Sequence, residues 1–334
     1  MDTVSEYAAK VRNEIAAVLA VHGHEAGQYS VLGPDPWQVV WNEDRSGFVP
    51  FLEGCRCLLA WRSPVASVDG QPELWARLVD HAEHVGKPLF ALEVNETTRA
   101  AGVKLGMVPI WVGTESFLEL STWSINGGQR QHLRRDRSHA AKFNMHWREA
   151  FPLTVSSDEV GIQHIEQLWK AERPERRTDS FLRTSFAELA DLRRYFVCEG
   201  PDGFTAFVTC TPVSREGWYL QDLVRSPDAP RGALEGAMVL ALEIFRDEGF
   251  TFASNGPLPF WRPNGTWSNP HQLGVIGNHV MKLFDRRYRF RGINQFRSKF
   301  EPDLVIPLYF LRTRRIITPS VVRSLIKLLK ERVT

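Results

Sequence analysis

Long apolar runs are missing from this 334-residue sequence, and its charge is nearly balanced at a net +2. A membrane-spanning helix needs about 18 or more consecutive apolar residues. No run reaches that length, so we expect no segment that crosses a membrane. The first six residues, Met-Asp-Thr-Val-Ser-Glu, lack the basic start and apolar centre of a signal peptide. We therefore expect a cytoplasmic protein.

Cysteine is also scarce, and its spacing does not match the usual cysteine sites. The four cysteines are Cys55, Cys57, Cys198 and Cys210. None of them forms the Cys-x-x-Cys pair of redox and zinc sites, and His22 and His24 have no companion cluster. The Gly-x-Ser-x-Gly motif of serine hydrolases is absent as well. We predict a reducing compartment, no metal site and no covalent enzyme intermediate.

Short apolar runs alternate with amphipathic stretches along the chain. Residues 57–61 and 89–94 are predicted strands, because they are short and bounded by Pro, Gly or charged residues. Residues 72–85 have helical spacing instead. Strands interleaved with helices predict an α/β fold with mixed sheets. A chain of 334 residues suits two domains of about 150 residues each.

Positive charge is concentrated in two segments. Residues 127–148 carry six basic residues and one acidic residue, residues 282–334 carry 14 and four, and the rest is net acidic. This distribution indicates either a surface for a polyanion or two solvated basic helices. Residues 127–142 are predicted to form a helix with almost no apolar face, so we expect it to stay outside the cores. It would connect a domain of residues 1–126 to one of residues 143–334.

The most informative stretch runs from Tyr219 to Gly232. It is a predicted strand, then a proline-rich turn, then the start of a long helix. A helix start of this kind favours a phosphate or a developing oxyanion. Acetyltransferases of the GNAT type hold the coenzyme A pyrophosphate at such a turn, and Arg231-Gly232-Ala233 agrees with part of their loop. An acyl-CoA N-acyltransferase is therefore one alternative.

The same stretch resembles the C-terminal catalytic region of the bacterial aminoacyl-phosphatidylglycerol synthases. The matching motif residues are Asp222, Leu223, Arg225, Asp228, Ala229, Pro230 and Gly232, and Glu235 stands where the family has an Asp. Residues 254–259 and 290–302 are similar to two further motifs of that family. The resemblance is weaker over residues 1–120.

This resemblance implies two tandem GNAT-like domains joined by a basic helix, an aminoacyl-tRNA donor and no dissociable cofactor. Family members that modify lipid usually carry an N-terminal membrane domain, and we find none here. We therefore expect an aminoacyltransferase with a small-molecule acceptor, such as one in antibiotic biosynthesis. The alternatives are transfer to phosphatidylglycerol, an acyl-CoA N-acyltransferase, and a non-catalytic RNA- or lipid-binding module.

The resemblance also suggests roles for single residues. An aminoacyl-tRNA ester is already activated, so the enzyme has to position its substrates, stabilise an oxyanion and move one proton. In this hypothesis Asp222 binds the α-ammonium group or takes the acceptor's proton, while Arg225 holds a phosphate or the oxyanion. Asn255 donates a hydrogen bond, and Arg297, which replaces a family Lys, binds the tRNA end together with Lys299. The other motif positions expected at the substrate are Asp228, Gly232 and Glu235.

Simpler interpretations stand beside these roles. Asp222 and Arg225 suit a salt bridge at a strand end. Arg130, Arg134 and Arg137 have helical spacing and form either a stripe that faces tRNA or an ordinary exposed face. The predicted tail helix, residues 319–333, is basic and amphipathic, so it lies either on anionic lipid as a peripheral membrane contact or on the domain.

Overall fold

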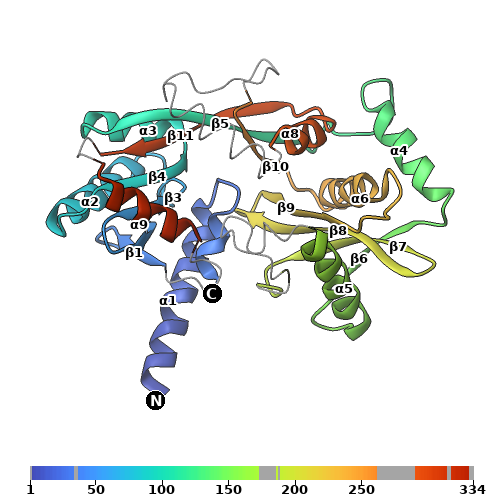
Figure 1. Cartoon of the computed structure of the whole chain (residues 1–334), viewed down its shortest axis with the longest axis horizontal. Coiled ribbons are helices and arrows are strands. Elements are labelled where there is room, and N and C mark those ends of the chain that lie inside the picture. Colours follow the sequence, from blue (N-terminus) through green and yellow to red (C-terminus); the bar gives the residue numbers. More distant parts are fainter. Residues whose placement is uncertain are drawn as a thin grey trace.

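The short apolar runs form the strands of one continuous sheet (Figure 1). The computed structural model describes residues 2–33, 37–172, 186, 189–261, 290–313 and 317–330. Within these residues, eleven strands lie in the order β1-β2-β3-β4-β11-β5-β10-β9-β8-β7-β6. β3 pairs parallel with β4 and β9 parallel with β10, and the other neighbours are antiparallel. The predicted α/β class with a mixed sheet is confirmed.

The elements have the following bounds. The strands are β1 (Gln38–Trp41), β2 (Phe48–Glu53), β3 (Leu58–Trp61), β4 (Leu89–Val94), β5 (Val108–Glu119), β6 (His146–Ala150), β7 (Arg194–Gly200), β8 (Gly203–Val213), β9 (Gly217–Arg225), β10 (Phe252–Pro259) and β11 (Leu304–Arg312). The helices are α1 (Asp2–His22), the 3-10 helix η1 (Gln28–Leu32), α2 (Gln71–His84), α3 (Glu96–Lys104), α4 (Gln131–Ala141), α5 (Ser156–Glu172), α6 (Ala233–Asp247), α8 (Phe290–Ser298) and α9 (Pro319–Lys330).

Strand β5 lies at the centre of the sheet, between β11 and β10. Thr114, Glu115 and Ser116 interrupt the apolar run of this strand. The strand continues through them, since all three residues are at most 2% exposed and find partners inside the fold. The Thr114 hydroxyl donates to the carbonyl of Trp261 at 3.1 Å, and the Ser116 hydroxyl to the carbonyl of Gly256 at 3.2 Å.

Strand β11 returns the chain to its first half. It pairs antiparallel with both β4 and β5. Helix α9 then packs Val321, Leu325 and Leu328 against side chains of β3 and β4. The strand order therefore crosses the predicted boundary at residues 127–142, and the division into two acyltransferase-like domains stays a prediction.

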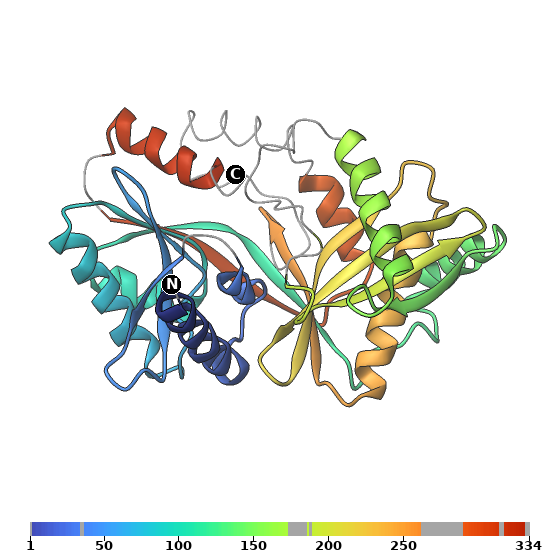
Figure 2. The same cartoon turned by 90° about the horizontal axis from the view of Figure 1, so that it is seen from below.

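Helices cover both faces of the sheet. The apolar face of α6 packs on the side of β7 and β8 that carries Phe196 and Val208. Helix α5 packs on the opposite side, against Val197 and Phe207. Neighbouring residues of one strand thus face different helices, as the two-residue period of a strand requires. Figure 2 shows α5 and α9 toward one side of the molecule and α6 toward the other.

Helix α4 enters a core, contrary to the prediction. Leu133 and Ala140 are fully buried in the same cluster as the apolar face of α6, and Asp136 is almost fully buried. Residues seven apart lie on one side of a helix after two turns, so two apolar residues suffice to seat it. The charged residues around them concealed this narrow face in the sequence.

Several elements were not predicted, namely α1, β2, β6, α8 and β11. The predicted helix over residues 271–284 lies outside the described residues. No helix in the described ranges combines the length and the apolar character needed to cross a bilayer.

Candidate active site

Asp222 lies on β9, half-buried and opposite Thr209 of β8. The Thr209 hydroxyl donates to the Asp222 carboxylate and accepts the backbone N–H of Asp222 at 3.2 Å, which fixes the carboxylate against the sheet. Burial raises the pKa of the Asp222 carboxyl, while the charges of Arg193 and Arg297 and the Thr209 hydrogen bond oppose that rise. A carboxyl group with a raised pKa binds a proton more readily than an ordinary Asp.

Arg225 is not brought to Asp222. The two residues are three apart on a regular strand, so their side chains point to opposite faces of the sheet. Val224 shares the face of Asp222 and packs on the α5 side, whereas Leu223 shares the face of Arg225 and packs on the α6 side. The simpler interpretation, a salt bridge between Asp222 and Arg225, is therefore wrong as well.

Asn255 and Arg297 join β10 to α8. The Asn255 amide donates to the carbonyl of Arg297 at 2.8 Å, and the Arg297 guanidinium donates to the carbonyl of Pro257 at 2.6 Å. Both side chains are buried. Burial raises the pKa of both Asp222 and Glu93, and the charge of Arg297 opposes both rises. Arg297 is thus an interior cation and not a surface contact for a tRNA phosphate.

Arg62 and the glutamates that lie in the same region as Arg297 and Asp222 were not identified from the sequence. Arg62, only 1% exposed, follows β3, and its Nη1 lies 2.8 Å from Oε2 of Glu115. Its Nη2 lies 3.2 Å from Oε2 of Glu93 on β4. Burial raises the pKa of Glu93 and of the nearby Glu25, and the charge of Arg62 opposes both rises. Tyr219 of β9 lies near Arg62 and Arg297, and burial raises the pKa of its hydroxyl.

We call these residues the central polar cluster: Glu25, Arg62, Glu93, Glu115, Tyr219, Asp222 and Arg297. Its members come from both halves of the chain. Arg62 and Glu93 also have positive φ angles of 63° and 58°, a backbone state that costs energy and is frequent at functional sites. A signal was present in the sequence, since Arg62, Glu93 and Glu115 end or interrupt three apolar runs, but nothing local showed that they meet.

The start of α6 is not an open phosphate site. Gly232 precedes the helix with φ of 96°, and a Cβ atom there would lie 1.8 Å from the backbone oxygen of Asp136 in α4. The buried Glu235 accepts a hydrogen bond from Nζ of Lys299 at 2.9 Å, and the same nitrogen lies 3.8 Å from Asp136. Helix α4 and two carboxylates thus occupy the place expected for a phosphate.

These contacts revise three predicted residues. Gly232 serves a close approach of two helices, and Lys299 neutralises Glu235 and Asp136. The surroundings of Gly232 and Glu235 are thus filled by groups of the protein, and their predicted roles at the substrate stay predictions. Asp228 is exposed in the loop before α6, and its side chain bonds to no residue that the structure describes.

Replacing Gly232 with Ala tests this packing. We expect the free energy of unfolding to fall by roughly 2–5 kcal/mol, because the new methyl group meets a backbone atom and the residue also keeps a left-handed conformation. Gly249, with φ of 87° and no atom within 4 Å of its added Cβ, is the matched control. Gly249→Ala should cost only about 1–2 kcal/mol. Equal losses in urea unfolding of the two variants would contradict the close contact.

The basic stripe on α4 lies on different residues from those predicted. Arg130 is buried and donates to the carbonyls of Phe300 and Glu301, both at 3.0 Å. Arg134 donates to a backbone carbonyl, and Arg137 pairs with an acid of α6 at 3.2 Å. The predicted stripe of three exposed arginines was therefore wrong.

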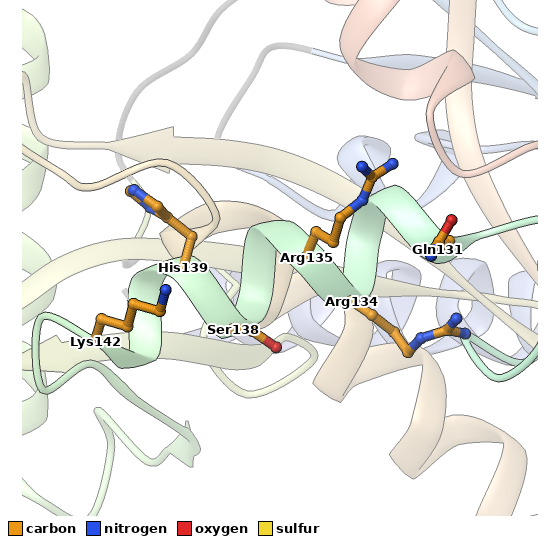
Figure 3. Close-up of a pocket in the computed structure, with 6 residues that line it drawn as sticks. All are labelled: Gln131, Arg134, Arg135, Ser138, His139 and Lys142. Atoms are coloured by element: carbon orange, nitrogen blue, oxygen red, sulfur yellow. The ribbon is translucent and has the colours of Figure 1, made fainter.

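Arg134 and five further residues of α4 and its C-cap line a surface pocket: Gln131, Arg134, Arg135, Ser138, His139 and Lys142 (Figure 3). Arg135, His139 and Lys142 are exposed. They follow one another at intervals of four and three residues, which places them on one side of the helix. This side of α4 presents positive charge without an exposed aliphatic residue among those that line the pocket.

Within the described ranges, no group of three or more His, Cys, Asp or Glu residues is placed to hold a metal ion. The central polar cluster holds its carboxylates against arginines instead. Groups arranged in this way can take part in proton transfer and charge stabilisation.

Known proteins are similar to this chain in sequence. A family model described as "Phosphatidylglycerol lysyltransferase, C-terminal" matches residues 37–312. The phosphatidylglycerol lysyltransferase of Staphylococcus aureus (strain MRSA252) is 20% identical over 281 residues, which are 80% of this chain and 32% of that protein. The chain thus spans about a third of the length of the curated relatives it matches.

Two solved structures share the fold. A C-terminal domain (DUF2156) from Agrobacterium fabrum, named for a lysylphosphatidylglycerol synthetase, matches with a TM-score of 0.81 at 18% identity, covering 97% of this chain and 98% of that one. L-PGS from Bacillus licheniformis matches with a TM-score of 0.73 at 17% identity, covering 95% and 96%. At these identities the likeness establishes the fold.

Proposed function

This chain belongs to the family of phosphatidylglycerol lysyltransferase C-terminal regions, and on that premise we propose that it transfers an aminoacyl group from charged tRNA to phosphatidylglycerol. The names of the relatives favour this lipid over the small-molecule acceptor expected from the sequence. The donor follows from the motif resemblance around Asp222.

One observation supports a catalytic role most directly: Asp222, a residue of the family motif, is held by Thr209 and feels the charges of Arg193 and Arg297. A half-buried carboxyl with a raised pKa is a suitable proton acceptor, so we prefer this role to binding of the α-ammonium group. The acceptor's hydroxyl oxygen attacks the ester carbon while Asp222 takes its proton. The ester bond to tRNA then breaks, and the released tRNA hydroxyl receives that proton.

The central polar cluster supplies charge for this step. A tetrahedral oxyanion needs a positive or hydrogen-donating group in a water-poor site. Within the cluster, Arg297 and the Tyr219 hydroxyl are the groups that interact electrostatically with Asp222. Arg225, exposed on the other face of the sheet, is left to contact a phosphate of the donor or of the lipid.

Transfer of radiolabel tests this proposal. Purified protein is incubated with a pool of labelled aminoacyl-tRNAs and vesicles that contain phosphatidylglycerol. We expect label in the lipid fraction, and none after treatment with ribonuclease. A parallel incubation with a small-molecule extract in place of vesicles tests the earlier acceptor. Label that stays on every tRNA in both incubations would refute the proposal.

The pocket side of α4 is our proposed docking surface for the tRNA donor. The slope of log affinity against log salt concentration measures the salt dependence of binding. Each lost phosphate contact should reduce the magnitude of this slope by about 1. For Arg135→Glu/Lys142→Glu we expect roughly tenfold weaker binding and a slope reduced by about 2. The matched control, Lys10→Glu/Lys104→Glu, changes the same charge at exposed positions of α1 and α3. The measurement is filter binding of tRNA at several salt concentrations. Equal slopes for the two double variants would contradict this docking surface.

A further inference from the structure

Helix α9 is seated on the sheet by one face only. Val321 is buried among side chains of β3 and β4, with Leu325 and Leu328 beside it. The Ser324 hydroxyl accepts the backbone N–H of Arg56 at 3.1 Å. These four α9 residues recur at intervals of three and four, so they form one continuous buried face.

A second set of apolar residues lies outside that face. Val322 and Ile326 are 41% and 44% exposed, and Ile317 just before the helix is exposed too. Val322 and Ile326 follow buried residues by one position, so they stand about 100° around the helix from them. We call Val322 and Ile326 the aliphatic ledge. The folded chain leaves these two side chains in contact with water, and this exposure of apolar surface costs free energy.

Positive charge adjoins the aliphatic ledge. Arg323 and Lys327 are exposed and come next around the helix after Val322 and Ile326. The sequence contains no Asp or Glu from Leu304 to Lys330, and residues 312–334 carry seven basic residues and one acidic residue. Aliphatic groups with long cationic side chains at their edge fit the boundary between lipid headgroups and acyl chains.

The contrast with α4 separates a membrane from RNA as the partner. The pocket side of α4 offers cations and polar groups, which suit phosphates alone. The exposed side of α9 adds aliphatic residues, which gain nothing from a phosphate backbone but are removed from water by a bilayer. A flat surface could also meet α5 on the same side of the molecule, where Val160 and Leu168 are exposed (Figure 2).

We propose that the exposed side of α9, formed by Val322, Arg323, Ile326 and Lys327, docks the protein on an anionic phospholipid surface. The inference rests on the proposed function for its purpose, since docking would bring the protein to phosphatidylglycerol. The choice of an anionic phospholipid surface as the partner follows from the exposed aliphatic residues and the cations beside them. The docking can be tested without the transfer reaction.

Vesicle sedimentation of the full chain tests the docking. We expect wild type to bind phosphatidylcholine vesicles that contain phosphatidylglycerol much better than pure phosphatidylcholine, and high salt to weaken that preference. Arg323→Gln/Lys327→Gln should bind roughly fivefold more weakly for each cation removed. Val322→Ser/Ile326→Ser should also bind more weakly, because it removes only the aliphatic part. The matched controls, Lys10→Gln/Lys104→Gln and Val68→Ser/Val103→Ser, change exposed residues elsewhere and should bind like wild type.

Several results would overturn the inference. One is wild-type protein that binds vesicles equally well with and without phosphatidylglycerol. Another is α9 variants that sediment with vesicles as well as their controls do. A third is release of vesicle-bound protein by uncharged tRNA that competes for α9. Transfer to detergent-dispersed short-chain phosphatidylglycerol separates the two proposals. The α9 variants should keep it, and wild type that binds vesicles without transferring label would sink the proposed function while leaving the docking intact.

Discussion

Replacing Asp222 with Asn is expected to lower kcat for aminoacyl transfer by about 10²- to 10⁴-fold, the usual contribution of a positioned proton acceptor. Asn is nearly the same size and can still bond to the Thr209 hydroxyl that holds the carboxylate, so the strand pairing around it should survive. Transfer of label from aminoacyl-tRNA to phosphatidylglycerol, at saturating concentrations of both substrates, is the measurement.

The pH dependence of the same reaction distinguishes catalysis from structure. Asp222 must be deprotonated to accept a proton, so wild-type kcat should fall as the pH drops through the pKa of this carboxyl. Burial raises that pKa, so the loss should occur at a higher pH than for an ordinary Asp. The Asn variant should lack this acidic limb. Asp202→Asn, at an exposed turn, is the matched control and should keep both the rate and the limb.

A small change in kcat with an unaltered pH profile would assign Asp222 a structural role. Thermal unfolding of both variants guards against a misfolded protein, since a large loss of stability in Asp222→Asn alone would mimic a catalytic effect.

Replacing Arg62 with Met is expected to lower the free energy of unfolding by about 3–5 kcal/mol, the cost of leaving buried charges without their partner. Arg62 is 1% exposed and pairs with Glu115 and Glu93, and its charge also opposes the rise that burial causes in the pKa of Glu25. Met fills a similar volume but offers no charge, so these carboxylates lose their main neutralising group.

The loss should depend on pH in a definite direction. Without Arg62, the pKa of Glu25 and Glu93 in the folded protein rises further above the unfolded value, because burial raises it and one opposing charge is gone. The folded state is then penalised at neutral pH, and the penalty fades as the pH falls through the raised pKa and the carboxylates become protonated. Urea unfolding at neutral and mildly acidic pH should show a smaller gap to wild type at the lower pH.

A surface arginine provides the control for Arg62. Arg77 pairs with Glu43 and Glu73, and its side chain is 34% exposed. Arg77→Met should cost no more than about 1 kcal/mol, since water screens such pairs. The double variant Arg62→Met/Glu115→Gln should recover part of the loss, because one uncompensated charge is removed. A loss for Arg62→Met as small as that for Arg77→Met would show that the cluster contributes little to the fold.

The sequence by itself determined where most elements lie and singled out the motif around Asp222. β4 occupies residues 89–94, as predicted, because a short apolar run between Pro88 and Asn95 has few other solutions. Helix α6 likewise begins at Ala233, directly after the turn where the sequence predicts the start of a long helix. Residue periodicity and turn residues act over a few positions, so they can be read locally. Asp222 was found in the same way, through neighbours in one motif.

Only the tertiary structure decided which residues meet. Arg62 and Glu115 are 53 positions apart, and Gly232 rests against Asp136 on another helix. Likewise, the narrow apolar face of α4 turned Arg130 inward, and β11 crossed from one end of the chain to the middle of the sheet. These outcomes depend on partner choice among distant segments. Such contacts are selected by the burial and hydrogen bonding of the whole fold, and no local pattern encodes them.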